Sequence, residues 1–149
     1  MRVVDAIDPK LVLTDLKVAN KEDMLKTLIK SLKANGYVND SEGFLKDVYD
    51  REAEGQTGIG NFVAIPHGKS IFVDKVGVAI GINHQEIPWE SLDNKGAKVI
   101  ILFAVGNDTE GAQEHLKLLS LFARKLGNDE VAHRLVNSQT VDDVINAFK

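Results

Sequence analysis

The sequence contains no cysteine, and only three of its 149 residues are prolines. The absence of cysteine excludes disulfides, thiolate catalysis and zinc sites built on sulfur ligands. No repeat, low-complexity stretch or Pro/Ser-rich linker divides the chain. Because this length suits one average domain, we expect a single domain that covers residues 1–149.

The sequence also lacks long apolar runs and an excess of basic residues. No apolar run approaches the roughly 20 residues that cross a membrane, and charges interrupt the first 17 residues, unlike a signal peptide. The formal net charge is −4. Since a nucleic-acid partner would favour a basic surface, we expect no nucleic-acid binding, and the composition fits a cytoplasmic protein.

Apolar residues at helical spacing predict five helices. Their expected ranges are residues 21–35, 41–54, 111–126, 129–137 and 141–148. Asn20 is a suitable N-cap for the first helix, and Thr140 with Asp143 forms a capping-box pattern before the last one. A glycine-rich link, residues 55–60, follows the second helix.

Three apolar segments predict strands, over residues 63–65, 76–82 and 98–105. The third is apolar almost throughout, which is typical of a central strand that is covered on both faces. Because helices and strands interleave along the chain, the predicted class is α/β, with helices on both faces of a sheet.

The segment from Arg51 to Gly68 carries the densest candidate chemistry. After the glycine-rich link, the predicted strand delivers Pro66, His67 and Gly68 at its end. Histidine is suited to proton or phosphoryl transfer near neutral pH. From these residues alone, however, a capped strand end with an exposed histidine is the favoured interpretation.

The sequence Gly68-Lys69-Ser70 resembles the end of a phosphate-binding P-loop. The first glycine of such a loop would stand at position 63, where the chain has Val63. The same valine takes the place of the third glycine in a dinucleotide fingerprint that would begin at Gly58. Nucleotide binding is therefore disfavoured.

Three more histidines are candidates of different weight. His115 falls on the apolar face of the predicted 111–126 helix, together with Leu116 and Phe122, so its side chain should point toward the sheet. Taken alone, it is more simply a structural core histidine. We expect His84, in a polar loop, and His133, in a short helix, to lie on the surface.

Together these residues resemble the active-site signature of the fructose/mannitol-type enzyme IIA family of the sugar phosphotransferase system (PTS). The matching segments are Arg51-Glu52, Thr57-Gly58-Ile59-Gly60, Ala64-Ile65-Pro66-His67-Gly68 and Glu114-His115-Leu116. The similarity also covers residues 25–38, 87–93 and 99–105, which is nearly the whole chain.

The resemblance implies a mixed sheet with helices on both faces and a phosphocarrier activity. His67 would accept a phosphoryl group on Nε2 from the phosphohistidine of HPr and pass it to a cognate enzyme IIB. The phosphate would derive from phosphoenolpyruvate, and no other cofactor or metal is implied. Contact with the membrane would be indirect, through the enzyme IIC complex, and the sugar that we expect is fructose, with mannitol or galactitol-like sugars as alternatives.

The resemblance also assigns roles around His67. His115 corresponds to the second active-site histidine, and Arg51 to the arginine near the phosphoryl group. Thr57, Gly58 and Gly60 are expected to support the phosphoryl group as donors. A hydrogen bond to the other ring nitrogen of His67 is expected to hold its tautomer.

Phe62 departs from the family pattern, which often has a small residue there. An aromatic side chain beside His67 would narrow the site or contact a partner, and with Ile59 it could form an apolar docking patch for HPr. Two other functions stay open. One is a regulatory binding module of the nitrogen-related type, and the other is a metal hydrolase built on His67 and His115, for which no third ligand is evident.

Overall fold

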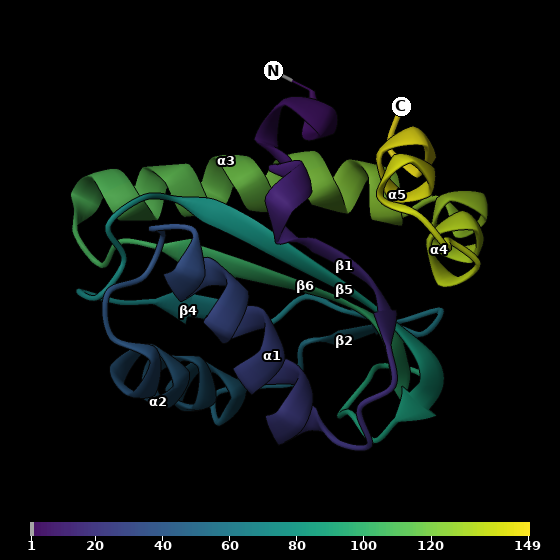
Figure 1. Cartoon of the computed structure of the whole chain (residues 1–149), viewed down its shortest axis with the longest axis horizontal. Helices are drawn as coiled ribbons and strands as arrows, with labels where there is room; N and C mark the ends of the chain where they lie inside the picture. Colours follow the sequence, from purple (N-terminus) through teal and green to yellow (C-terminus); the bar gives the residue numbers. More distant parts are fainter. Residues whose placement is uncertain (1) are drawn as a thin grey trace.

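A mixed six-stranded sheet lies at the centre of the computed structural model, which describes residues 2–149 (Figure 1). Its strands are β1 (Val12–Leu16), β2 (Gly58–Gly60), β3 (Val63–Ala64), β4 (His67–Lys69), β5 (Gly77–Ile87) and β6 (Ala97–Val105). Their order is β1-β5-β6-β3-β2, and β4 also pairs with β6. The β5–β6 and β2–β3 pairs are antiparallel, whereas β1–β5, β3–β6 and β4–β6 are parallel. The expected α/β class with a mixed sheet is confirmed.

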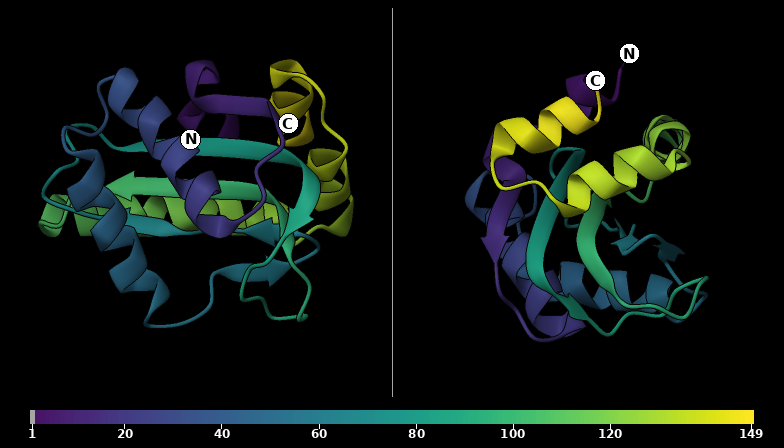
Figure 2. Two further views of the ribbon diagram at one scale, coloured as in Figure 1. Left: turned by 60° about the horizontal axis from the view of Figure 1, so that its bottom comes forward. Right: turned by 90° about the vertical axis from the view of Figure 1, so that its right-hand side faces the viewer.

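Helices cover both faces of this sheet, as expected (Figure 2). On one face lie α1 (Lys21–Ala34) and α2 (Ser41–Glu52), and on the other lie α3 (Thr109–Leu126), α4 (Asp129–Val136) and α5 (Val141–Ala147). Two 3₁₀ turns, Val3–Ala6 and Pro9–Leu11, precede β1. The side chain of Asn20 accepts the Asp23 amide at the start of α1, and Thr140 and Asp143 form the predicted capping box of α5.

Strand β6 shows why the sheet is buried on both faces. Its alternate side chains enter two cores, with Val99, Ile101 and Phe103 facing α3 and with Ile100, Leu102 and Ala104 facing α1 and α2. All six are fully buried. The near-continuous apolar run therefore predicted the environment of this strand correctly.

The sequence patterns missed three strands and shortened a fourth. β1, β2 and β4 were not expected, and β5 continues beyond Ile82 to Ile87, so that His84 lies on a strand rather than in a loop. β2 and β4 contain glycine and few β-branched residues. Their extended form depends on pairing with β3 and β6 rather than on local propensity, which explains why local patterns did not reveal them.

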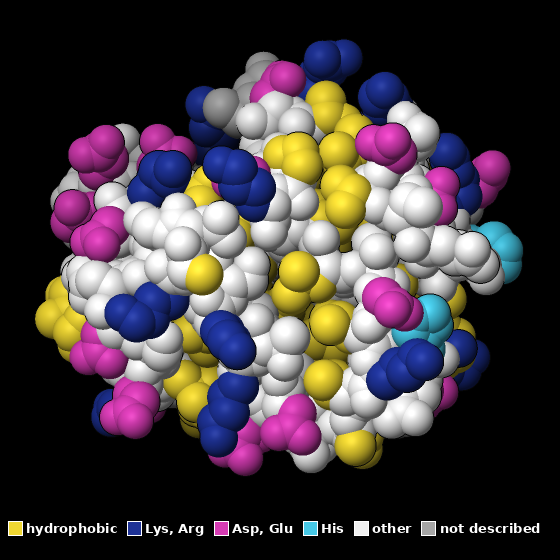
Figure 3. Space-filling view, in the orientation of Figure 1, with side chains coloured by type: hydrophobic (Ala, Val, Ile, Leu, Met, Phe, Trp, Pro, Cys, Tyr) yellow, Lys and Arg dark blue, Asp and Glu magenta, His cyan; other side chains and the backbone are white. Residues whose placement is uncertain are grey.

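Acidic and basic side chains intermingle over the face that α1 and α2 cover (Figure 3). Within residues 2–149, no helix combines the length and the apolar character needed to cross a membrane.

Candidate functional site

His67 is the first residue of β4 and lies opposite Phe103 of β6. The prediction placed it at the end of the 63–65 strand, but it begins a strand of its own, and the alternative interpretation of an exposed histidine at a strand end is wrong. Pro66 interrupts the pairing, but its carbonyl accepts the Phe103 amide at 3.0 Å, so the chain returns to β6. The side chain of His67 points to the α3 side of the sheet, against Phe103, and only 5% of the residue is exposed.

His115 of α3 lies against His67. The centroids of the two imidazole rings are 4.6 Å apart, and the ring planes are inclined by 58°. The prediction that His115 faces the sheet is therefore confirmed. The predicted apolar face of this helix is partly wrong, because Leu116 is 69% exposed and Leu118 is buried in its place.

Burial keeps both histidines uncharged at neutral pH. Desolvation, with smaller contributions from His115 and Arg51, lowers the pKa of His67 to about 3. Desolvation also lowers the pKa of His115, aided by the charges of Lys69 and Arg51. A neutral imidazole has one nitrogen with a free lone pair, which is the form required of a nucleophile.

The ring nitrogens of His67 differ in their surroundings. Among residues 2–149, the Nδ1 atom of His67 and the Nε2 atom of His115 are the buried side-chain nitrogens or oxygens with no hydrogen-bond partner. The expected hydrogen bond that would hold the His67 tautomer is therefore not formed within the described chain. Nε2 of His67 is not enclosed in this way, so it is the ring nitrogen that an incoming group can reach.

Arg51 lies in the last turn of α2, near both histidines. Its Nη1 donates to the carbonyl of Gly55 at 3.1 Å. The guanidinium forms no ion pair with the described residues. An arginine with free donors beside a neutral imidazole is suited to bind an anionic group.

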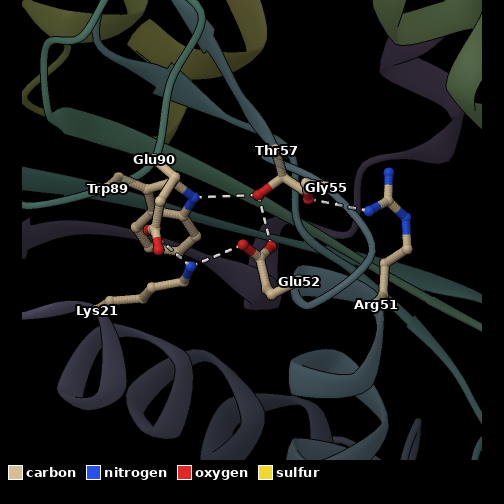
Figure 4. Close-up of polar contacts among 7 residues, drawn as sticks. All are labelled: Lys21, Arg51, Glu52, Gly55, Thr57, Trp89 and Glu90. Carbon is tan, nitrogen blue, oxygen red and sulfur yellow. Dashed lines mark hydrogen bonds and ion pairs between the residues drawn. The ribbon is translucent and has the colours of Figure 1, made fainter.

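Thr57, Gly58 and Gly60, which the sequence assigned as supporting donors, differ in their hydrogen bonds and backbone conformation. The Thr57 hydroxyl donates to Glu52 Oε1 at 2.5 Å and accepts from Trp89 Nε1 at 3.0 Å (Figure 4). The Gly58 amide donates to the carbonyl of Glu90 at 3.0 Å. Gly60 has a φ of +94° and leads into the β2–β3 turn. Thr57 and Gly58 already use their hydrogens, so in this conformation they hold the backbone rather than offer donors.

Phe62 does not lie beside His67, which corrects the expectation from the sequence. Val63 is opposite Val99 and His67 is opposite Phe103, so the two ends differ by about 13 Å along β6. Instead, the ammonium groups of Lys95 and Lys98 lie over the Phe62 ring, at 5.6 and 5.5 Å from its centroid.

The remaining histidines lie on the surface, as predicted. His84 Nε2 is 2.7 Å from Asp15 Oδ1, and His133 is exposed near Asn137. Among the residues that the structure describes, no three His, Cys, Asp or Glu side chains are grouped so that they could hold a metal ion. Glu52 belongs to the sequence signature, which indicates no role for it, and no sequence pattern indicated the contacts of Lys21 and Trp89 near Thr57.

Comparison with known families agrees with this geometry. The family model described as "Phosphoenolpyruvate-dependent sugar phosphotransferase system, EIIA 2" matches residues 5–149. The chain belongs to this family. The match includes all the site residues above, from Arg51 to His115.

Relatives of this EIIA domain include both short and long proteins. A fructose-specific EIIA component of Haloferax volcanii is 32% identical over 130 residues, which cover 85% of this chain and 83% of the relative. The 2-O-α-mannosyl-D-glycerate-specific EIIABC component of Escherichia coli is 28% identical over 132 residues, which cover 89% of this chain. The chain spans only 20% of the length of that relative and 23% of the fructose-specific EIIABC component of Bacillus subtilis.

Solved structures share the same fold. The nitrogen regulatory protein IIA-Ntr from Neisseria meningitidis has a TM-score of 0.87 at 21% identity, with 99% of each chain covered. A complex of E. coli enzyme IIA-mannitol with phosphorylated enzyme IIB-mannitol gives a TM-score of 0.80 at 23% identity, with 95% of this chain and 96% of the other covered.

Proposed function

We propose that this EIIA domain is a phosphocarrier in which Nε2 of His67 accepts a phosphoryl group from the phosphohistidine of HPr. The observation that carries the proposal is the neutral His67–His115 pair, with His67 buried and His115 half-buried, in which Nδ1 of His67 is enclosed and Nε2 is not. The lone pair on Nε2 attacks phosphorus, the N–P bond of the donor breaks, and the donor imidazole leaves with that electron pair. The proton of His67 stays on Nδ1 throughout.

Arg51 and His115 are the groups that would stabilise the transferred phosphoryl group. In phosphoryl transfer the protein mainly positions the reactants and offsets charge on the three equatorial oxygens. Arg51 supplies an uncompensated cation, and His115 supplies a ring close to His67. No cofactor takes part in this step, because the phosphate arrives already activated, as a phosphohistidine formed from phosphoenolpyruvate.

The next acceptor in this proposal is a cognate enzyme IIB. The E. coli mannitol protein with the same fold was solved as a complex with its phosphorylated IIB, which supports a similar partner here. Two exposed apolar side chains adjoin the site in sequence, Ile71 at 68% and Leu116 at 69% exposure. Apolar contact around the nucleophile would exclude water from the transfer.

Fructose is the sugar that we propose for the pathway, with mannitol as the next candidate, because relatives of similar length carry these specificities. A regulatory role is the second candidate, since IIA-Ntr of N. meningitidis has the same fold. We measure transfer from the phosphorylated protein to fructose-type and to mannitol-type IIB domains. The faster acceptor indicates the sugar, and if neither accepts phosphate faster than hydrolysis, the regulatory role is favoured.

The direct test uses enzyme I, HPr and phosphoenolpyruvate with the purified protein. Intact mass spectrometry should find a single added phosphate that is lost in acid, as a phosphohistidine is. His67→Ala should abolish the addition, whereas His133→Ala, at an exposed histidine on α4, should leave it unchanged. A phosphate that persists in His67→Ala would refute the proposal.

A further inference from the structure

Four side chains form a continuous chain of polar contacts beside the site (Figure 4). Lys21 Nζ, at the start of α1, is 2.7 Å from Glu52 Oε2, at the end of α2. The other carboxylate oxygen of Glu52 accepts the Thr57 hydroxyl, which in turn accepts the indole N–H of Trp89. The ammonium of Lys21 also lies over the Trp89 ring, 4.7 Å from its centroid, so that the four side chains form a closed ring of contacts. We refer to these four residues as the Glu52 network.

The Glu52 network is largely shielded from solvent. The side chain of Glu52 is 6% exposed and that of Lys21 is 16% exposed, while Thr57 and Trp89 are buried. A buried ion pair gains little net stability, because desolvation offsets most of its attraction. Removal of Lys21 would leave the buried Glu52 carboxylate without a cation, whereas removal of Glu52 would leave Lys21 paired only with the exposed Glu90, at 3.1 Å. Such a network fixes positions more than it stabilises the fold.

The positions that it fixes are those of Arg51 and His67. Glu52 directly follows Arg51, and the Arg51 guanidinium bonds to the Gly55 carbonyl in the turn between Glu52 and Thr57. On the other side, the Thr57 carbonyl accepts the amide of Ile65, two residues before His67, at 2.9 Å. Thr57 is therefore joined to the element that carries the arginine and to the segment that carries the nucleophile.

We infer that Glu52 is a positioning residue for phosphoryl transfer, which rests on the function proposed above. Through Thr57 it holds the end of α2 against the segment that leads into β4, and so sets the place of the Arg51 guanidinium relative to His67. Glu52 itself does not contact the phosphoryl group, because both of its carboxylate oxygens face the network. Trp89 supports the network from the β5–β6 loop.

The test measures phosphorylation of His67 by phospho-HPr in rapid-quench experiments. Glu52→Gln places an amide donor against Lys21 or Thr57, and Thr57→Val removes the shared hydroxyl. Because misplacement by about 1 Å can cost on the order of a hundredfold in rate, we expect a loss of roughly tenfold to a hundredfold at saturating HPr, with little change in KM. Thr57→Ser should recover most of the rate, and Glu54→Gln, at an exposed carboxylate in the same turn, is the matched control.

A double-mutant cycle separates positioning from a general loss of order. If Glu52 acts through Arg51, Glu52→Gln should slow an Arg51→Lys protein much less than it slows the wild type. Trp89 is the sole tryptophan, so its emission reports directly whether the network has opened. We expect a shifted emission in Thr57→Val and a wild-type spectrum in Thr57→Ser.

The outcomes separate this inference from the proposed function. A wild-type protein that takes up no phosphate would overturn the proposed function itself. A wild-type protein that is phosphorylated, with folded Glu52→Gln and Thr57→Val proteins that react at its rate, would overturn only the positioning role. Fully additive losses of rate in the Glu52→Gln and Arg51→Lys double mutant would also overturn the positioning role. If Glu52→Gln does not fold, Thr57→Val alone decides the question.

Discussion

His67 and His115 come from different elements, an edge strand and a long helix, and place their ring centroids 4.6 Å apart. Each ring helps to remove the other from water, and burial is the main reason why both pKa values are low. The pair is therefore neutral at physiological pH. In the proposed transfer, His67 acts as the nucleophile while His115 lies beside it.

We expect His115→Ala to accept phosphate on His67 but to transfer it poorly to enzyme IIB. The loss should be on the order of a hundredfold, because general acid–base or hydrogen-bonding groups commonly contribute that much. Rapid-quench transfer from the isolated phosphoprotein to IIB measures it. His84→Ala, at an exposed histidine of β5, is the matched control, and wild-type transfer by His115→Ala would contradict the expectation.

The stability of the protein should depend on pH through His67. Its pKa is about 3 in the folded state against an ordinary value of 6.5, so below pH 6.5 the unfolded chain binds a proton that the folded chain does not. The contribution is complete above pH 6.5 and is lost as the pH falls toward 3, by about 1.4 kcal/mol per pH unit. The low pKa of His115 acts in the same direction.

Urea unfolding at a series of pH values measures this effect. Between pH 7 and pH 5 the free energy of unfolding should fall by about 2 kcal/mol more in the wild type than in His67→Gln, which carries no titratable ring. Carboxylates titrate equally in both proteins and cancel in the comparison. Parallel pH profiles would show that His67 has the same pKa in the folded and the unfolded protein.

Leu116→Gln should weaken partner docking without loss of stability. The side chain is 69% exposed and follows His115 directly, so a polar replacement removes little buried area and leaves the core intact. We expect KM for HPr or IIB to rise about threefold to tenfold, with kcat and the melting temperature near wild type. Leu92→Gln, at 67% exposure in the β5–β6 loop, is the control, and an equal effect there would argue against a patch at Leu116.

At position 62, a glycine variant should be more stable than an alanine variant, the reverse of the usual order. Asn61 and Phe62 have φ values of 55° and 65°, the left-handed conformation of a tight β2–β3 turn. Because a Cβ atom costs roughly 1–2 kcal/mol in this region, Phe62→Gly should be more stable than Phe62→Ala by about 1 kcal/mol in thermal unfolding. In most strand or helix positions the alanine variant would be the more stable one.

The aromatic contacts of Phe62 do not enter this comparison. Both variants lose the contacts with Lys95 and Lys98, so these cancel in the comparison. A more stable Phe62→Ala protein would mean that this turn relaxes when the ring is removed.

Much of the fold was readable from the sequence, because helices and the central strand carry strong periodic patterns. The caps at Asn20 and Thr140 and the apolar run of β6 reflect interactions within a few residues or uniform burial. The short strands β2 and β4 were not readable in this way. Glycine and histidine do not favour an extended backbone, and these segments are extended because β3 and β6 lie beside them.

The sequence by itself determined the class of the fold, the two histidines and the arginine as candidates, and membership of a family whose signature they share. Only the tertiary structure decided what surrounds them. In the structure His67 is buried beside His115, Leu116 is exposed, Phe62 lies away from His67, and the Thr57 hydroxyl is hydrogen-bonded to Glu52. Burial and pKa depend on neighbours that are distant in sequence, and no local pattern records which side chains a sheet brings together.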